Sequence, residues 1–137
     1  RSVRVGFRVS MAPRPQSASP AMKPATQPSG YRRAVNIDEV AWQPSRMTAG
    51  VQVKDVALTD GLELQIVRVE PGAGFPRHAH DSPEFIYILE GELVQNGRRL
   101  GRGWASVSGA GTVDEDVHSD TGCTFLLVDR PYSPEGG

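Results

Sequence analysis

Residues 72–91 read Gly-Ala-Gly-Phe-Pro-Arg-His-Ala-His-Asp-Ser-Pro-Glu-Phe-Ile-Tyr-Ile-Leu-Glu-Gly, and the most specific predictions for this chain come from them. It contains two of the three histidines of the chain, His78 and His80, separated by one residue. Side chains along an extended strand repeat with a period of two, so both imidazoles are expected on one face. The tripeptide at residues 81–83, Asp-Ser-Pro, predicts a turn that brings the carboxylate of Glu84 close to the two imidazoles.

His78, His80 and Glu84 together offer two imidazole nitrogens and one carboxylate oxygen. These donors suit a divalent transition metal, and a set of three leaves coordination positions open for other ligands. We therefore expect a metal at this point, with zinc, iron, manganese and nickel as the candidates.

The composition is typical of one small β-rich domain. The chain has 137 residues, and its 15 glycines and 11 prolines separate short apolar runs, which predicts strands rather than helices. A net charge of −1 and a pI near 6.3 indicate no nucleic-acid partner. No apolar run reaches the roughly 18 residues of a membrane span. The single cysteine, Cys123, excludes an intrachain disulfide, is expected to be a small buried hydrophobe, and indicates a reducing, cytoplasmic compartment.

The first 30 residues are expected to lie outside the folded domain. Residues 1–10 alternate Val and Phe with Arg and Gly, which is the period of a strand, but we favour a leader because a lone strand needs a partner. Residues 11–30 hold five prolines and almost no large apolar side chain, which is typical of a linker. The domain is therefore expected to comprise residues 31–137.

Two dipeptides give the clearest local predictions. Asp60-Gly61 and Asn96-Gly97 each separate two strand-like runs and predict two-residue hairpin turns. Residues 123–128 read Cys-Thr-Phe-Leu-Leu-Val, a continuous apolar run that predicts a strand buried on both faces. Many short strands without a helix of 10 residues predict an all-β sandwich or barrel.

The spacing within residues 72–91 resembles the first signature motif of the cupin superfamily. That motif runs Gly, five residues, His-x-His, three residues, Glu, six residues, Gly, and it is matched at Gly72, His78, His80, Glu84 and Gly91. The resemblance implies an all-β fold, a small antiparallel β-barrel of the jelly-roll type, also called a double-stranded β-helix. It also implies that the metal lies inside the wider end of the barrel.

The second cupin motif is matched with departures. Gly103 and Gly111 fit its two glycines, while Gly109 stands where the motif has proline. Counting on from these positions, Asp114 stands where the motif has its histidine ligand, and His118 stands where it has asparagine. The identity of the fourth protein ligand is therefore open.

Two ligand sets compete for this fourth position. Asp114 would give two imidazoles and two carboxylates, a hard set that suits iron(II) or manganese. His118 would supply a third imidazole if the loop is shifted, and we favour it because all three histidines would then converge on one point. Four carboxylates crowd residues 114–120, and their repulsion requires a cation, an arginine or water to relieve it.

Residues 71–80 and 120–128 look similar to the cupins of ChrR-type anti-sigma factors. This subgroup includes a zinc-binding regulatory module and small dioxygenases that act on acetylacetone or hydroxyacetophenone-like carbonyl compounds. The resemblance implies a metal-dependent enzyme, dioxygenase-like, whose substrate is a small carbonyl or aromatic compound. The alternatives are a non-catalytic zinc-binding sensory or ligand-binding module, and a barrel that has lost its metal because Asp114 replaced a ligand. Cupins commonly pair through sheet edges, so a homodimer is also expected.

Overall fold

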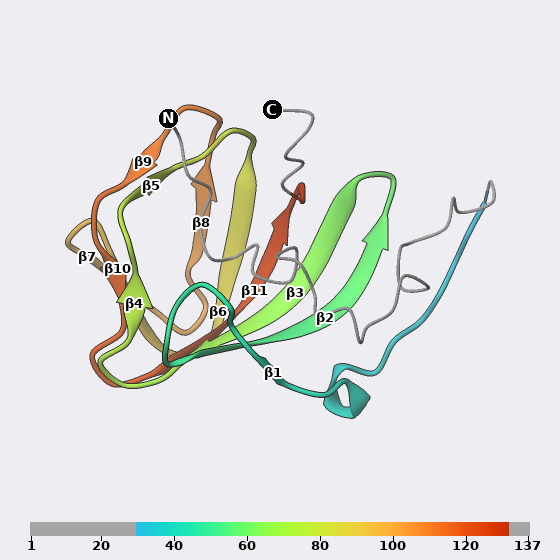
Figure 1. Ribbon diagram of the computed structural model, residues 1–137, viewed down its shortest axis with the longest axis horizontal. Helices are drawn as coiled ribbons and strands as arrows, with labels where there is room; N and C mark the ends of the chain where they lie inside the picture. Colours follow the sequence, from blue (N-terminus) through green and yellow to red (C-terminus); the bar gives the residue numbers. More distant parts are fainter. Residues whose placement is uncertain (1–29, 132–137) are drawn as a thin grey trace.

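The computed structural model describes residues 30–131, which form a curled, nearly all-β structure (Figure 1). Residues 1–10, interpreted above as a leader, and the predicted linker except for its last residue, Gly30, lie outside the described part of the chain. Within the described range, no helix has the length and apolar character of a membrane span.

One short helical turn precedes the strands, and the strands pair antiparallel throughout the described residues. In chain order the elements are η4 (Ile37–Glu39), β1 (Gln43–Pro44), β2 (Val51–Thr59), β3 (Leu62–Val69), β4 (Gly74–Phe75), β5 (His78–Ala79), β6 (Glu84–Gln95), β7 (Arg98–Gly101), β8 (Ala105–Ser108), β9 (Val113–Asp114), β10 (Val117–His118) and β11 (Cys123–Asp129).

The strands belong to two sheets. The larger sheet has the order β1-β2-β3-β11-β6-β10-β4, with β7 and β8 also paired to β6. The smaller sheet consists of β5 and β9. Figure 1 shows the larger sheet curled into a half barrel, with β4 and β10 on one wall, next to the small β5–β9 sheet, and with β2, β3 and β11 on the other wall. The predicted all-β barrel of the cupin type is thus confirmed.

The long strand β6 connects the two walls. Its first half pairs with β11 and β8, and its second half pairs with β7 and β10. On β11, Phe125 faces Ile88 and Thr124 faces Glu90, which leaves Leu89 as an extra residue in β6. An extra residue of this kind is a β-bulge, which bends and twists its strand. The bulge therefore lets one strand serve both walls.

Both predicted hairpins are confirmed, and their turns share one geometry. Asp60 and Gly61 join β2 to β3 with φ angles of 51° and 79°. Asn96 and Gly97 join β6 to β7 with φ angles of 50° and 84°. Positive φ at both central residues is the mark of a type I′ turn, whose twist matches that of the flanking strands.

The predicted strand at residues 123–128 is β11, in the middle of the sheet, but only one of its faces is fully buried. Cys123, Phe125 and Leu127 point inward and are at most 5% exposed, whereas the alternate residues are partly exposed. The expectation of burial on both faces was wrong, because the sheet turns its outer face toward solvent. The inward residues join an apolar core whose members are Val51, Val67, Val69, Phe75, Ile86, Ile88, Leu93, Leu100, Val117, Cys123, Phe125 and Leu127.

Toward one end of the barrel the inner face becomes polar. The strand registers place Glu63, Asp129 and Glu84 in one row across β3, β11 and β6. Directly paired residues share a face of the sheet, and these three are 5%, 1% and 3% exposed. In the next row, Gln65 is fully buried, and its side-chain Nε2 donates a hydrogen bond of 2.8 Å to Asp55.

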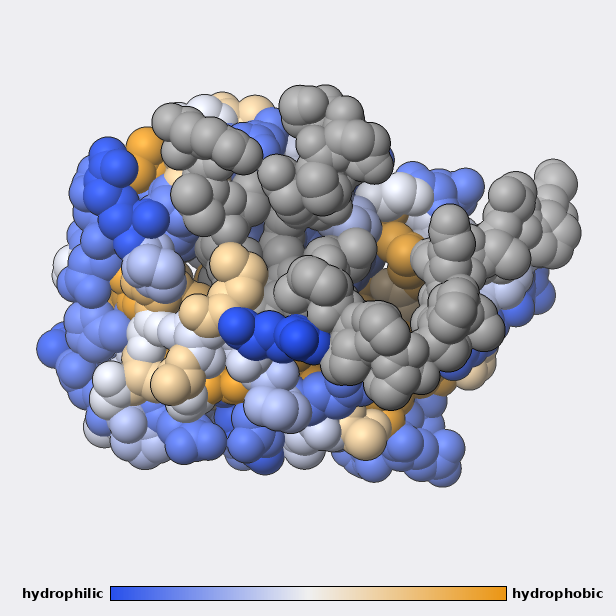
Figure 2. All heavy atoms as spheres, in the orientation of Figure 1, coloured by the Kyte–Doolittle hydropathy of each residue, from blue (hydrophilic) through white to orange (hydrophobic). Residues whose placement is uncertain are grey.

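The outer face beside this polar row is apolar. Phe85 and Val107 are paired across β6 and β8, and 49% and 66% of their surfaces are exposed. Tyr87, one row further along β6, is 45% exposed. The face seen in Figure 2 carries hydrophilic residues along its left and lower margins, with apolar residues mostly in the recesses between them.

The Cys123 thiol provides a simple test of the core packing. Burial raises its pKa to about 12. An ordinary thiol has a pKa near 8.5, so the thiolate fraction at pH 8 is about a thousandfold lower in the folded protein. We therefore expect a chromogenic disulfide reagent to react with Cys123 slowly in the native protein and rapidly in guanidinium chloride. Complete reaction of the native protein within seconds would contradict this packing.

Candidate metal centre

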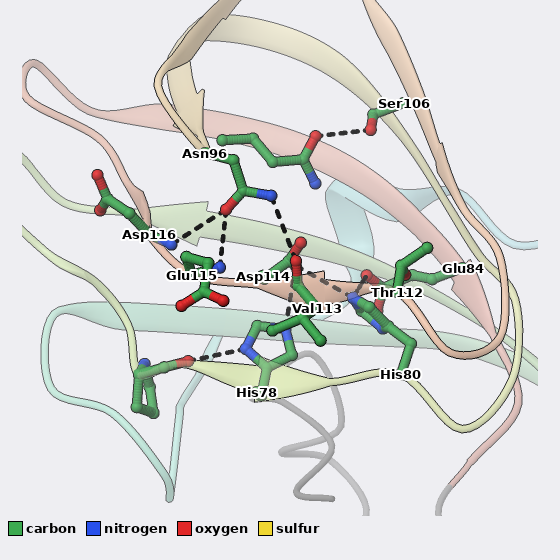
Figure 3. A network of polar contacts seen from close by, with 12 residues as sticks. His78, His80, Glu84, Asn96, Ser106, Thr112, Val113, Asp114, Glu115 and Asp116 are labelled. Carbon is green, nitrogen blue, oxygen red and sulfur yellow. Dashed lines mark hydrogen bonds and ion pairs between the residues drawn. The ribbon is translucent and has the colours of Figure 1, made fainter.

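Three of the predicted side chains meet inside the barrel (Figure 3). His78 comes from β5, His80 follows directly after β5, and Asp114 comes from β9. The Nε2 atoms of His78 and His80 lie 3.0 Å and 3.1 Å from the same carboxylate oxygen, Oδ2 of Asp114. One donor atom from each of the three residues lies within 4.8 Å of the others, and all three side chains are buried.

The small β5–β9 sheet creates this meeting point. His78 is the direct cross-strand partner of Asp114, and such partners have Cβ atoms only about 4.5–5.5 Å apart. The short aspartate side chain can therefore reach the imidazole. His80 continues the ladder, because its backbone N–H donates to the Thr112 carbonyl (2.9 Å) and its carbonyl accepts from the Gly111 N–H (2.8 Å). The two imidazoles lie on one face as predicted, with ring centroids 4.9 Å apart.

The hydrogen bond made by Nδ1 of His78 determines which ring nitrogen faces the centre of the site. Nδ1 lies 2.7 Å from the carbonyl oxygen of Pro76. A carbonyl oxygen only accepts, so Nδ1 donates its proton to Pro76, and Nε2 is the ring nitrogen that faces Asp114. An imidazole held in this way would bind a metal through Nε2.

Asp114 is ionised despite its burial. Burial raises the pKa of this carboxyl, but the hydrogen bonds and charges of His78 and His80 outweigh it and hold the pKa below its usual range. The carboxylate is therefore charged at neutral pH and ready to act as a ligand.

Glu84 stands at the edge of the same group. It is the first residue of β6, its side chain is buried, and its Oε1 lies 3.7 Å from Nε2 of His80. Its place in the row with Asp129 and Glu63 connects the histidines to the polar inner face.

His118 lies in a different environment. Val117 is buried, and neighbours along a strand project from opposite faces, so the imidazole of His118 points the other way. Its Nδ1 is 2.8 Å from Oδ1 of Asp116 and its Nε2 is 3.1 Å from Oδ1 of Asp120. The hydrogen bond to Asp116, together with the charges of both carboxylates, raises the pKa of His118. The geometry thus places Asp114, rather than the favoured His118, beside the other two histidines, and the assignment of the ligands stays a prediction.

Cationic side chains relieve the repulsion expected among the other carboxylates of residues 114–120. Arg77 Nε lies 2.8 Å from Glu115 Oε1, and Arg99 Nη1 lies 3.1 Å from Asp120 Oδ2. Both ion pairs are exposed to solvent, where such pairs contribute little to stability. These carboxylates therefore have partners on the protein surface.

Three polar residues near the centre were not singled out by the sequence analysis. Glu63 and Asp129 belong to the buried row that includes Glu84. Asn96 was interpreted only as a turn residue, yet its side chain contacts the segment that carries Asp114. No spacing rule marks these residues, because only the strand registers bring them to the site.

The comparisons with known proteins agree with this geometry. A family model of the ChrR cupin-like domain matches residues 31–133. No curated protein sequence matches the chain. A structure from Methylibium petroleiphilum PM1, provisionally assigned as an acetylacetone dioxygenase, is similar with a TM-score of 0.69 and 16% identity over 82% of this chain and 89% of that one.

Two further structures show the same fold. The polyketide cyclase RemF from Streptomyces resistomycificus aligns with a TM-score of 0.64 and 24% identity over 74% of this chain and 83% of that one. A chain of the Rhodobacter sphaeroides complex of SigE with the anti-sigma ChrR aligns with a TM-score of 0.58 and 18% identity, over 68% of this chain and 50% of that one. The family match covers most of the chain and agrees with the fold and with the first motif. The chain therefore belongs to the ChrR cupin-like family.

Proposed function

We propose that the protein is a metal-dependent enzyme of the oxygenase type, acting on a small carbonyl or aromatic compound. The observation that carries the proposal is the convergence of His78, His80 and Asp114, three buried donors whose reactive atoms face one point. Two histidines and one carboxylate with open positions are the ligand set typical of non-haem iron(II) oxygenases.

The residues fit a divalent metal in three respects. The hydrogen bond from Nδ1 of His78 to Pro76 leaves Nε2 as the nitrogen that would bind the metal. Asp114 is ionised and neutralises one positive charge of the ion. Glu84 would add a second carboxylate from the side of His80, giving a hard ligand set that favours iron(II) or manganese.

When bound, the metal would act as a Lewis acid and as a template that orients the substrate. The chain's own residues would define the surroundings of that substrate. Asp129 and Glu63 extend the polar inner face away from Glu84. Ile86 and Leu127, one row deeper, would contact its apolar part.

Two neighbours support the choice of substrate class. Their names refer to acetylacetone and to polyketides, both of which are carbonyl compounds. At 16% and 24% identity the two structures establish a shared fold only. The proposed substrate class therefore stands only together with the proposed metal centre.

Oxygen consumption by the iron(II)-loaded protein tests this function. We expect uptake with at least one member of a panel of β-diketones and catechol-like compounds. Asp114→Ala is expected to abolish the uptake, whereas Glu115→Gln, which removes a neighbouring exposed carboxylate, is expected to retain it. A failure of all compounds with iron, manganese and nickel would overturn the oxygenase proposal.

A non-catalytic zinc module is the second candidate, because the matching family model is that of the ChrR cupin-like domain. In that case the zinc would be closed by four protein ligands with no exchangeable water. Zinc would then raise the melting temperature of the protein, and no compound of the panel would be turned over with any metal. Turnover of any compound of the panel would therefore exclude this second candidate.

A further inference from the structure

Asn96 contacts the backbone on both sides of Asp114 (Figure 3). Its side-chain Oδ1 accepts hydrogen bonds from the N–H groups of Glu115 (2.7 Å) and Asp116 (3.1 Å). Its Nδ2 donates to the carbonyl of Val113 at 3.4 Å, and its own backbone N–H donates to the Asp116 carbonyl at 2.7 Å. The hairpin turn between β6 and β7 is thereby fastened to the β9–β10 segment.

These bonds matter because β9 is otherwise held weakly. Within residues 30–131 its strand pairing is with β5 alone, in a small sheet separate from the larger one. At the start of β9 the backbone bonds of His80 to residues 111–112 hold the chain. After Asp114 the segment turns toward β10, which pairs with β6 and β4, and Asn96 holds the turn itself through its side chain and its backbone N–H.

The aspartate makes this end of β9 sensitive to small shifts. An aspartate side chain is shorter than a histidine side chain, so the backbone of Asp114 has to stay close to His78 for its carboxylate to reach the 3.0 Å distance. Ligand positions in metal sites tolerate little error, and the partners that orient ligands commonly account for 10–100-fold in affinity.

We propose that Asn96 is a positioning residue of the metal centre, fixing the β9–β10 segment so that Asp114 meets His78 and His80. This inference rests on the proposed metal-binding function. The positive φ of 50° at Asn96 meets the requirement of the turn, while the side-chain hydrogen bonds serve the site, so one residue has two separable roles.

The test uses two substitutions that separate these roles. Asn96→Gly keeps the positive φ of the turn and removes every side-chain hydrogen bond. Asn96→Asp also suits the turn and keeps an oxygen that accepts from Glu115 and Asp116, while it loses the long bond to Val113 and adds a negative charge to the acidic segment. Glu115→Gln is the control, because it changes an exposed side chain of the same segment but leaves its backbone bond to Asn96 intact.

Two properties are measured with Co²⁺ as the probe: its dissociation constant by competition with a chelator, and its visible d–d spectrum. We expect Asn96→Gly to weaken binding roughly tenfold to a hundredfold and to alter the spectrum. We expect Asn96→Asp to restore most of the affinity, and Glu115→Gln to behave like the wild type.

A merely structural role would have a different result. If Asn96→Gly lowers the melting temperature of the metal-free protein but leaves the Co²⁺ affinity and spectrum unchanged, Asn96 supports only the turn and this inference is overturned. If the wild-type protein itself binds no Co²⁺, the proposed metal-dependent function falls first and this inference with it.

Discussion

Asp114→Asn is expected to weaken the binding of a divalent metal by at least about 100-fold, which is the upper end of the effect of removing a partner that only orients a ligand. The substitution keeps the size of the side chain but removes the negative charge that faces both imidazoles. It also removes the group that is held ionised by His78 and His80. Isothermal titration with Mn²⁺ or Zn²⁺, on protein purified without a histidine tag, measures the change.

His118→Asn is the matched control for this experiment. His118 pairs with the exposed carboxylates of Asp116 and Asp120, and ion pairs of this kind at a protein surface contribute little free energy. The substitution is therefore expected to change the metal affinity by less than about threefold. If His118→Asn abolished binding and Asp114→Asn did not, the third ligand would be the histidine. If neither substitution changed the metal affinity, neither Asp114 nor His118 would be a metal ligand.

Gly91→Ala is expected to destabilise the fold far more than Gly72→Ala, although both glycines belong to the same motif and both have positive φ. A Cβ atom at Gly91 would overlap the carbonyl oxygen of Gly122 and lie 2.8 Å from Cα of Cys123, both of which are backbone atoms. A Cβ at Gly72 would meet nothing within 4 Å.

The expected magnitudes follow from these surroundings. A left-handed conformation costs an alanine about 1–2 kcal/mol, which is the whole expected effect at position 72. At position 91, β6 also has to move away from β11, and overpacking of this kind adds about 1–3 kcal/mol. Urea unfolding followed by circular dichroism measures both free energies of unfolding. Similar losses for the two variants would contradict the close approach of β6 to the Gly122–Cys123 backbone.

Gly91 also explains why the fold could be predicted from sequence. At Gly91 two backbone segments come too close for any side chain, so only glycine fits there. The identity of the residue therefore indicates the close approach in the sequence itself. The two hairpins were predictable for the same reason, since Asp60-Gly61 and Asn96-Gly97 supply the positive φ that type I′ turns need.

The site was predicted in part. The alternation of a strand places His78 and His80 on one face, and counting along the second motif gives Asp114. We favoured His118 because all three histidines would then lie together, and this reasoning left out the direction of each side chain in β10. There Val117 points inward and His118 points outward. The phase of a two-residue strand cannot be read from so short a pattern.

The burial of Glu63, a member of the polar row, could not be predicted from the alternation of polar and apolar residues in β3. In β3 the apolar residues Leu62 and Leu64 alternate with Glu63 and Gln65, and the hydrophobic effect alone would place the leucines inside. The structure has the reverse, with Leu62 45% exposed and Glu63 5% exposed. A pattern of apolar residues predicts the wrong orientation where the buried face of a strand is polar.

Anomalous X-ray diffraction from crystals of the zinc-loaded protein shows whether His78, His80 and Asp114 hold one metal ion. We expect a single strong anomalous peak about 2.0–2.2 Å from Nε2 of His78, Nε2 of His80 and a carboxylate oxygen of Asp114. A crystal grown at saturating zinc with no peak between these three side chains, or with its strongest peak beside His118, would mean that they do not form the metal centre.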